Sequence, residues 1–190
     1  YLPGIGEPPN AAALQIEPLI AELFTNLGGS TSVVSLRDFH AENLLWLPDR
    51  RGTARVGLLD FQDAFVTDPA YDLVSLFQDA RRDVSKDVEA ACLKHFLART
   101  GRTEASFLPL YALLGAQRAL RIIGIFARLS MASGKTRYLE FTPRVWGYLD
   151  RSLAHPALAQ LAIAIRDGLP RPTPERLERI ATAWQMNRMQ

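Results

Sequence analysis

Leu36-Arg-Asp-Phe-His-Ala-Glu-Asn43 and Leu58-Leu-Asp-Phe-Gln-Asp63 are the two stretches that decide the fold of this chain. One apolar run follows the first stretch (residues 44–47), another leads into the second (residues 55–59), and a polar turn at residues 48–52 separates them. Two short apolar runs on either side of a turn are typical of a β-hairpin. Such a hairpin would bring Asp38, Asn43 and Asp60 to one end of its ladder.

These three side chains form a set suited to a metal ion and to phosphoryl transfer. Carboxylate and amide oxygens favour Mg²⁺, which takes one or two protein carboxylates and leaves its other positions to water and phosphate. Asp38 would be the catalytic residue that orients and deprotonates the attacking hydroxyl, and Asn43 and Asp60 would hold the metal. The spacing Asp-x-x-x-x-Asn, followed by a strand-ending Asp-Phe, matches the catalytic and metal loops of the protein-kinase-like fold. Either motif alone is common, so their order and the Asp68-Pro-Ala-Tyr-Asp72 stretch after them make the prediction specific.

The same stretches resemble a known superfamily. Residues 36–47, Gly57-Leu-Leu-Asp-Phe-Gln-Asp-Ala64 and Asp68-Pro-Ala-Tyr-Asp-Leu-Val-Ser75 are similar to the aminoglycoside phosphotransferases and choline kinases. Within that group they are most similar to the N-acetylmuramate/N-acetylglucosamine anomeric sugar kinases. The resemblance implies ATP and Mg²⁺, a sugar or amino sugar as acceptor, and transfer of the γ-phosphate to its C1 hydroxyl. It also implies a cytoplasmic enzyme of cell-wall recycling.

The resemblance further implies a missing part. In the superfamily, a smaller N-terminal lobe carries a Gly-rich loop over the phosphates and a Lys that pairs with them. Here the lysines are Lys86, Lys94 and Lys135, all after the predicted catalytic loop, and residues 1–9 are typical of an irregular connector. We therefore expect residues 1–190 to be a single domain, the C-terminal lobe, whose nucleotide-covering N-terminal lobe belongs to the same protein. This lobe alone should bind ATP poorly and be inactive.

Two departures from the superfamily bear on the acceptor. Leu36 stands where many aminoglycoside kinases have His, and Gln62 replaces the Gly of an Asp-Phe-Gly triplet. The short spacing between Asp60 and Asp68 leaves little room for a regulated activation loop, which argues against a protein substrate. An aminoglycoside or choline-type kinase and a non-catalytic binding module remain as alternatives. A metal-dependent hydrolase is weaker, because no His cluster completes such a site.

Four residues near the motifs are candidates for supporting roles. Asp72 would either brace the catalytic loop, as its counterpart does in the superfamily, or cap the following helix. His40 would be a hydrogen-bonding neighbour of the site or a metal ligand. Asp63 would assist the metal or cap a turn, and Arg37 is expected to support the site beside Asp38.

Three polar residues on a later apolar stretch are candidates for binding the acceptor: Gln117, Arg118 and Arg121. They would either lie on the exposed edge of a helix or face the cleft. In the cleft, an arginine suits a carboxylate such as a lactyl group, because its planar guanidinium can bind both oxygens.

The composition is that of an ordinary globular domain. The 190 residues are 48% hydrophobic and 22% charged, with a net charge of +2, and no basic-aromatic pattern points to nucleic acid. Cys92 is the only cysteine, which fits a reducing compartment. The longest apolar stretch, residues 112–131, is interrupted by a glutamine and three arginines, so no membrane span is expected.

The pattern as a whole predicts a mainly α (α+β) fold, a protein-kinase-like C-terminal lobe in which the hairpin carries the catalytic and metal loops. A short strand at 32–36 would enter the loop, and residues 64–70 would be a loop. The helix at 85–100 should bury Val88, Ala91, Cys92, Phe96 and Leu97, and Gly115 or Gly124 could break the helix at 104–131. Trp46, Trp146 and Trp184 are expected in the core or in groove walls. The predicted helices are 11–27, 70–79, 85–100, 104–131, 138–152, 156–167 and 173–185.

Overall fold

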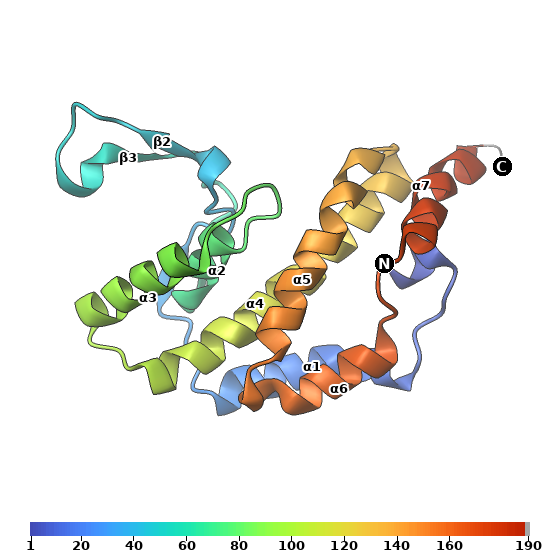
Figure 1. Cartoon of the computed structure of the whole chain (residues 1–190), viewed down its shortest axis with the longest axis horizontal. Coiled ribbons are helices and arrows are strands. Elements are labelled where there is room, and N and C mark those ends of the chain that lie inside the picture. Colours follow the sequence, from blue (N-terminus) through green and yellow to red (C-terminus); the bar gives the residue numbers. More distant parts are fainter. Residues whose placement is uncertain (189–190) are drawn as a thin grey trace.

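The computed structural model describes residues 1–188, and Figure 1 shows a mainly helical body from which one β-hairpin projects. The predicted fold class is confirmed. The helices are α1 (Ala11–Asn26), α2 (Ala70–Phe77), α3 (Lys86–Thr100), α4 (Glu104–Ser133), α5 (Thr142–Leu153), α6 (Ala159–Gly168) and α7 (Pro174–Arg188). The strands are β1 (Val33–Ser35), β2 (Leu44–Trp46), β3 (Val56–Leu58) and β4 (Phe65–Thr67).

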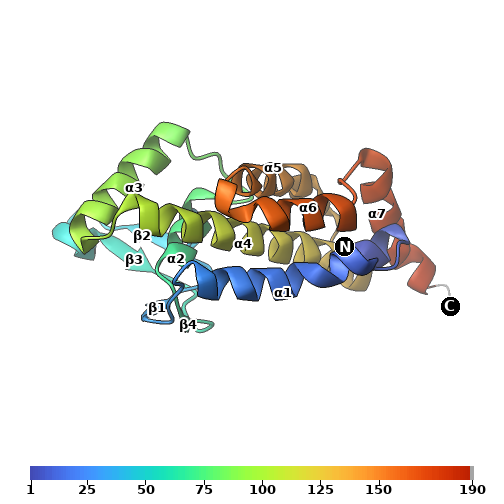
Figure 2. The same ribbon diagram turned by 90° about the horizontal axis from the view of Figure 1, so that it is seen from below.

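Helix α4 is the central element, and α1, α2, α5 and α7 all pack against it (Figures 1 and 2). Its ends are well defined, because the Thr103 side chain accepts a hydrogen bond from the Ser106 N–H and Gly134 takes a left-handed conformation with φ of 65°. By length and composition α4 is the one helix in the described residues that could cross a membrane. Most of its apolar surface is instead covered by the chain's own helices, with Leu113 and Ala116 fully buried.

The expected break in α4 is wrong, because the helix runs without interruption through Gly115 and Gly124. Gly115 serves close packing. A Cβ atom there would stand 2.6 Å from Ser152 Oγ of α5 and 3.1 Å from Gln78 Nε2 at the end of α2. The missing side chain therefore lets both neighbours approach α4.

The described residues form two small antiparallel sheets. The predicted hairpin is confirmed, with Leu44 opposite Leu58 and Trp46 opposite Val56. The second sheet pairs β1 with β4, so the prediction of a loop over residues 64–70 is wrong in its first half. Three residues are too few for a readable alternation, and their partner strand lies about thirty residues earlier in the chain.

The predicted buried face of α3 is confirmed for Leu97 and wrong for Val88, Ala91 and Cys92. The residues that α3 buries are Glu89, Leu93 and Leu97, while Val88 and Cys92 are exposed. Glu89 is buried because it is paired: the Tyr111 hydroxyl donates to it at 2.6 Å, and Arg151 lies 2.8 Å away.

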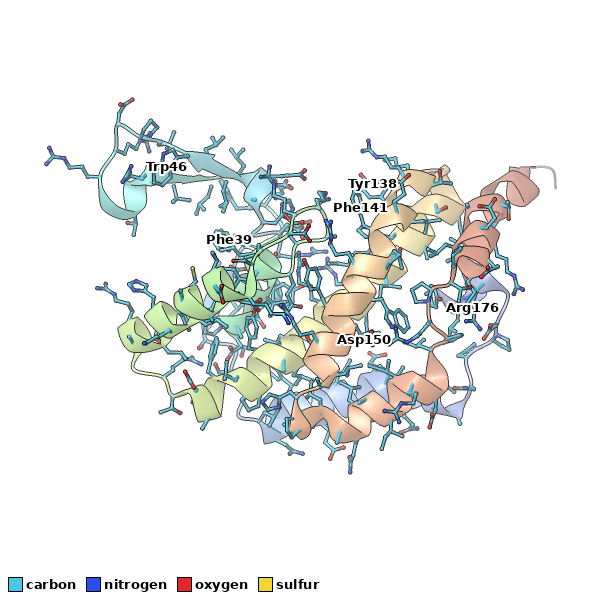
Figure 3. All side chains as sticks on the ribbon, in the orientation of Figure 1. Phe39, Trp46, Tyr138, Phe141, Asp150 and Arg176 are labelled. Carbon is cyan, nitrogen blue, oxygen red and sulfur yellow. The ribbon has the colours of Figure 1, made fainter. Side chains whose placement is uncertain are left out.

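Trp146 and Trp46 differ in burial. Trp146 is buried in the core as predicted, but Trp46 is exposed on the projecting hairpin, where Figure 3 labels it and Arg55 lies over its ring. The Trp184 side chain lies outside the described side chains.

Candidate active site

The Asp72 carboxylate holds the loop that follows β1. It accepts hydrogen bonds from the Ser35 hydroxyl at 2.6 Å, the Leu36 N–H at 2.8 Å and the Arg37 N–H at 3.1 Å. The start of α2 is served by another residue, since the Asp68 carboxylate accepts from the Ala70 N–H at 3.0 Å. Of the two roles expected for Asp72, the contacts are those of a loop brace.

The loop is held in a strained conformation just before Asp38. Arg37 has φ of 66°, which is unfavourable for a residue with a Cβ atom. Two donors converge on its carbonyl oxygen: the Ser75 hydroxyl at 3.2 Å and Arg118 Nη1 at 3.4 Å. The Arg37 side chain forms an exposed ion pair with Asp63 at 3.4 Å. This contact gives Asp63 a partner other than the expected metal or turn.

Asn43 is fixed to the same loop by three hydrogen bonds. Its side-chain Nδ2 donates to the Asp38 carbonyl at 2.9 Å, and its backbone bonds to the His40 carbonyl and the Leu59 N–H, each at 2.9 Å. Because the amide nitrogen is occupied, Oδ1 is left to accept a ligand. The Leu59 bond also ties Asn43 to the residue before Asp60.

Asp60 follows the hairpin at the same end as Asn43. It has φ of 56°, a second strained position, and the Gln62 side-chain amide donates to its Oδ1. The two available ligands are an amide oxygen and an exposed carboxylate, which are hard donors of the kind that Mg²⁺ accepts. Within the described residues, no cluster of three His, Cys, Asp or Glu forms a larger metal site. The donor set therefore fits Mg²⁺ shared with phosphate oxygens better than a metal held by protein alone.

Asp38 and Asp60 line one cavity of about 320 Å³ between the loop, the end of α2 and α4. His40 and Asp79 line it too, and its apolar wall comes from α4. Four arginines and three aspartates share this lining: Arg37, Arg81, Arg118, Arg121, Asp38, Asp60 and Asp79. The charges are nearly balanced, so the cavity is not an acidic one. A larger cavity of about 660 Å³ between α1 and α4 is mostly apolar and has no aspartate in its lining.

The three polar residues on α4 differ in position. Arg118 is 5% exposed and reaches within 4.0 Å of Asp38 Oδ1, so an exposed edge is the wrong description for it. Arg121 is half-buried, donates to the Tyr71 hydroxyl at 3.0 Å and lines the Asp38 cavity. Gln117 lines two neighbouring cavities but not this one.

His40 is buried against the loop. Burial lowers its pKa below 6.5, and the nearby Asp79 opposes that effect without overcoming it. The ring is therefore neutral at pH 7. Its Nε2 lies 3.5 Å from Asn43 Nδ2, which has only protons to offer, so Nε2 is the acceptor and the ring proton is on Nδ1. This contact is that of a hydrogen-bonding neighbour of the site.

Sequence reasoning missed Asp79 and Arg81. The Asp79 Oδ1 atom accepts from the Arg81 N–H at 3.0 Å, and Arg81 pairs with Glu42 of the catalytic loop at 3.2 Å. The only signal was two charged residues directly after an apolar helix, which is common at a surface. Asp79 is buried and Arg81 is half-buried, and the contact between Arg81 and Glu42 depends on how the loop folds.

The chain belongs to the phosphotransferase enzyme family, whose model matches residues 6–113. It is 51% identical over 152 residues to an N-acetylmuramate/N-acetylglucosamine kinase of Caulobacter vibrioides, covering 80% of this chain and 42% of that protein. It is 32% identical over 142 residues to a kinase of the same name from Pseudomonas putida, covering 69% of this chain and 40% of that protein. The chain thus spans less than half the length of these curated relatives. The predicted family is confirmed, and the family match includes the Asp38 loop and Asp72 but ends before Arg118.

Proposed function

We propose that this chain is the catalytic and acceptor-binding part of an ATP-dependent sugar kinase. The acceptor would be N-acetylmuramate or N-acetylglucosamine, and the phosphoryl group would go to the anomeric hydroxyl. The names of the relatives support the choice of sugar. The observation that carries the proposal is the position of Asp38, braced on the rim of a cavity large enough for one sugar ring and close to two metal-ligand candidates.

The charge of that cavity supports a neutral or acidic acceptor. Four arginines against three aspartates give no acidic surface for a polycationic aminoglycoside and tolerate a carboxylate. Arg121 is the best candidate for the acidic substituent of a muramate, since its hydrogen bond goes to the neutral Tyr71 hydroxyl. Gln117 stays a weaker candidate, because it lines the neighbouring cavities.

In the proposed reaction, Asp38 accepts a hydrogen bond from the sugar hydroxyl and takes its proton as the oxygen attacks the γ-phosphorus. A new oxygen–phosphorus bond forms, the bond from the γ-phosphorus to the bridging oxygen breaks, and ADP leaves. Mg²⁺ held by Asn43 and Asp60 would supply charge neutralisation at the phosphates. Arg118 helps to orient the Asp38 carboxylate, because its Nη1 atom lies 4.0 Å from Asp38 Oδ1.

An N-terminal nucleotide-covering lobe is part of the proposal. Among the described side chains, ten large hydrophobic residues are exposed between residues 33 and 66: Val33, Val34, Leu45, Trp46, Val56, Leu58, Leu59, Phe61, Phe65 and Val66. They lie on β1 to β4 and on the loop that carries Asp60, and Figure 3 labels one of them, Trp46, on the projecting hairpin. An apolar surface of this kind is typical of a face that another part of a protein covers. With ATP as the donor, we propose a cytoplasmic enzyme.

The test is a ³¹P NMR assay on the full-length gene product that contains this chain. The assay would hold ATP, Mg²⁺ and one of four acceptors: N-acetylglucosamine, N-acetylmuramate, choline or an aminoglycoside. We expect a sugar-1-phosphate signal with the two sugars. Asp38→Asn should lower the rate by at least about 10³-fold while the melting temperature stays close to that of the wild type. A signal only with choline or an aminoglycoside, or full activity of Asp38→Asn, would overturn the proposal.

A further inference from the structure

We propose that Asp79, with His40 and Arg118, binds hydroxyl groups of the acceptor other than the one that reacts. The inference rests on the proposed sugar-kinase function, which it makes specific. All three side chains line the cavity that also holds Asp38, and they are 3%, 9% and 5% exposed. Each has one polar atom without a hydrogen-bond partner among the described residues: Asp79 Oδ2, His40 Nδ1 and Arg118 Nε.

Asp79 supplies the acceptor atom of this group. Its Oδ1 is engaged by the Arg81 N–H at 3.0 Å, which fixes the carboxylate at the end of α2. Its Oδ2 is buried and unpartnered. Buried carboxylate oxygens are normally paired, because an unpaired one has lost its water without replacement. Because Asp79 also lines the cavity, this unpartnered oxygen supports a ligand that brings a hydrogen-bond donor.

His40 and Arg118 supply donors. The Asn43 side chain donates to His40 Nε2, so the ring proton is on Nδ1, the unpartnered atom. Arg118 uses Nη1 on the Arg37 carbonyl and lies beside Asp38, which leaves its Nε–H without a partner. The three lining residues thus hold one acceptor and two donors that have no partner among the described residues.

This mixture fits a polyhydroxylated ring. Each hydroxyl group donates one hydrogen bond and accepts others, so neighbouring hydroxyls can satisfy an acceptor and a donor together. Ile122, Ile125 and Phe126 line the same cavity and suit the C–H face of a pyranose. A quaternary ammonium group would satisfy neither His40 nor Arg118, since it has no lone pair to accept their protons.

Steady-state kinetics of the full-length protein give the first test. Asp79→Asn keeps Oδ1 for the Arg81 N–H and replaces Oδ2 by an NH₂ group. We expect the KM for N-acetylglucosamine to rise by about 10- to 100-fold, with the KM for ATP unchanged. Asp83→Asn is the control, because Asp83 is an exposed carboxylate paired with Arg144 at 3.3 Å. Equal KM values for wild type and Asp79→Asn would overturn the proposal.

Deoxy sugars separate a direct contact from a structural effect. The 3-, 4- and 6-deoxy analogues of N-acetylglucosamine each remove one hydroxyl. With wild type, one of them should show a raised KM, and with Asp79→Asn that analogue should be bound as well as the parent sugar. If Asp79→Asn raises KM by the same factor for N-acetylglucosamine and for every deoxy analogue, Asp79 does not contact the sugar.

A binding measurement on the wild type covers the case in which Asp79→Asn fails to fold. The ¹⁵N signals of the His40 ring would be followed as N-acetylglucosamine is added without ATP. A shift of the Nδ1 signal is expected, and an unchanged His40 signal at a saturating sugar concentration would contradict the proposal. This readout needs no catalysis, so it also distinguishes the two proposals. If wild type binds sugar at His40 but transfers no phosphate to it, the kinase function fails and the hydroxyl site stands.

Discussion

Asp72 shows how a single carboxylate can hold the loop that carries Asp38. It accepts from three donors in residues 35–37, and the strained Arg37 conformation depends on them. We expect Asp72→Asn to lower the free energy of unfolding by about 1–3 kcal/mol. The substitution replaces one carboxylate oxygen by an NH₂ group, which cannot accept the hydrogen bonds that Asp72 accepts from residues 35–37. Activity should fall further than stability, since Asp38 directly follows the strained residue. Urea unfolding and turnover would both be measured.

Asp87 provides a matched control for Asp72. Both acids stand in the first turn of a helix, α3 for Asp87 and α2 for Asp72, so both interact with a helix dipole. Asp87 is exposed, and we expect Asp87→Asn to cost at most about 0.5 kcal/mol. Similar losses for the two variants would mean that Asp72 acts through the dipole and not through the loop.

For single residues of the candidate site, the sequence predicted those in the motifs and missed those whose position depends on tertiary contacts. Asp38, Asn43 and Asp60 have a fixed spacing that reflects local geometry, and the structure brings all three to the same end of the hairpin. Arg118 and Asp79 have no such spacing. Their burial follows from the Asp38 loop packing between α2 and α4, which no local pattern encodes.

Among the elements, α4 offers two glycines in opposite surroundings. A Cβ at Gly115 would meet Ser152 Oγ at 2.6 Å, whereas a Cβ at Gly124 has no atom within 4 Å. Gly124→Ala should stabilise the protein by about 0.5–1 kcal/mol through helix propensity. Gly115→Ala gains the same propensity but forces α5 away, and should destabilise the protein by about 1–3 kcal/mol. Thermal unfolding of the pair would reveal the difference, and equal shifts would mean that α5 adjusts freely.

Tyr111, at the junction of α3, α4 and α5, should make the free energy of unfolding fall at high pH. Burial, and then the hydrogen bond to Glu89, raise the pKa of Tyr111 well above 10. The unfolded chain can ionise this tyrosine near pH 10, but the folded chain cannot. The stability from Tyr111 is therefore complete below pH 10 and is lost as pH rises, by about 1.4 kcal/mol per pH unit.

Urea unfolding of wild type and Tyr111→Phe between pH 8 and pH 11 would measure this loss. The phenylalanine variant should be the less stable one at pH 8, and its deficit should shrink above pH 10. Tyr138→Phe is the control, because the hydrogen bond from Arg137 lowers the pKa of Tyr138 and reverses the sign. A deficit of Tyr111→Phe that does not change with pH would contradict the prediction.

The same junction explains why the predicted buried face of α3 was partly wrong. A glutamate in an amphipathic pattern is assigned to solvent, yet Glu89 is 7% exposed because Tyr111 and Arg151 bond to it. The strand β4 was missed for a similar reason, since its three residues are defined by pairing with β1. The long helices were predicted well because their periodicity and caps are local.

For the molecule as a whole, this chain supplies more of the proposed acceptor site than of the proposed nucleotide site. The acceptor cavity is built entirely from the Asp38 loop, α2, Asp60 and α4, all within this chain. On the proposed phosphate side, the ligand candidates among the described residues are Asn43 and Asp60. They lie near an exposed apolar face, and the three lysines of the chain lie in other elements. Residues 1–190 studied alone should therefore keep their affinity for the sugar but lose most of their affinity for ATP.

We expect isothermal titration of the 190-residue chain to detect N-acetylglucosamine with an affinity close to that of the full-length protein. ATP with Mg²⁺ should bind at least about 100-fold more weakly than to the full-length protein, because no covering loop or paired lysine contacts the phosphates. Asp79→Asn should weaken sugar binding and leave the residual ATP binding unchanged. Asp60→Ala should remove the metal dependence of the residual ATP binding. Micromolar ATP affinity of the chain alone would mean that the nucleotide site is complete within these residues and that the exposed apolar face serves another purpose.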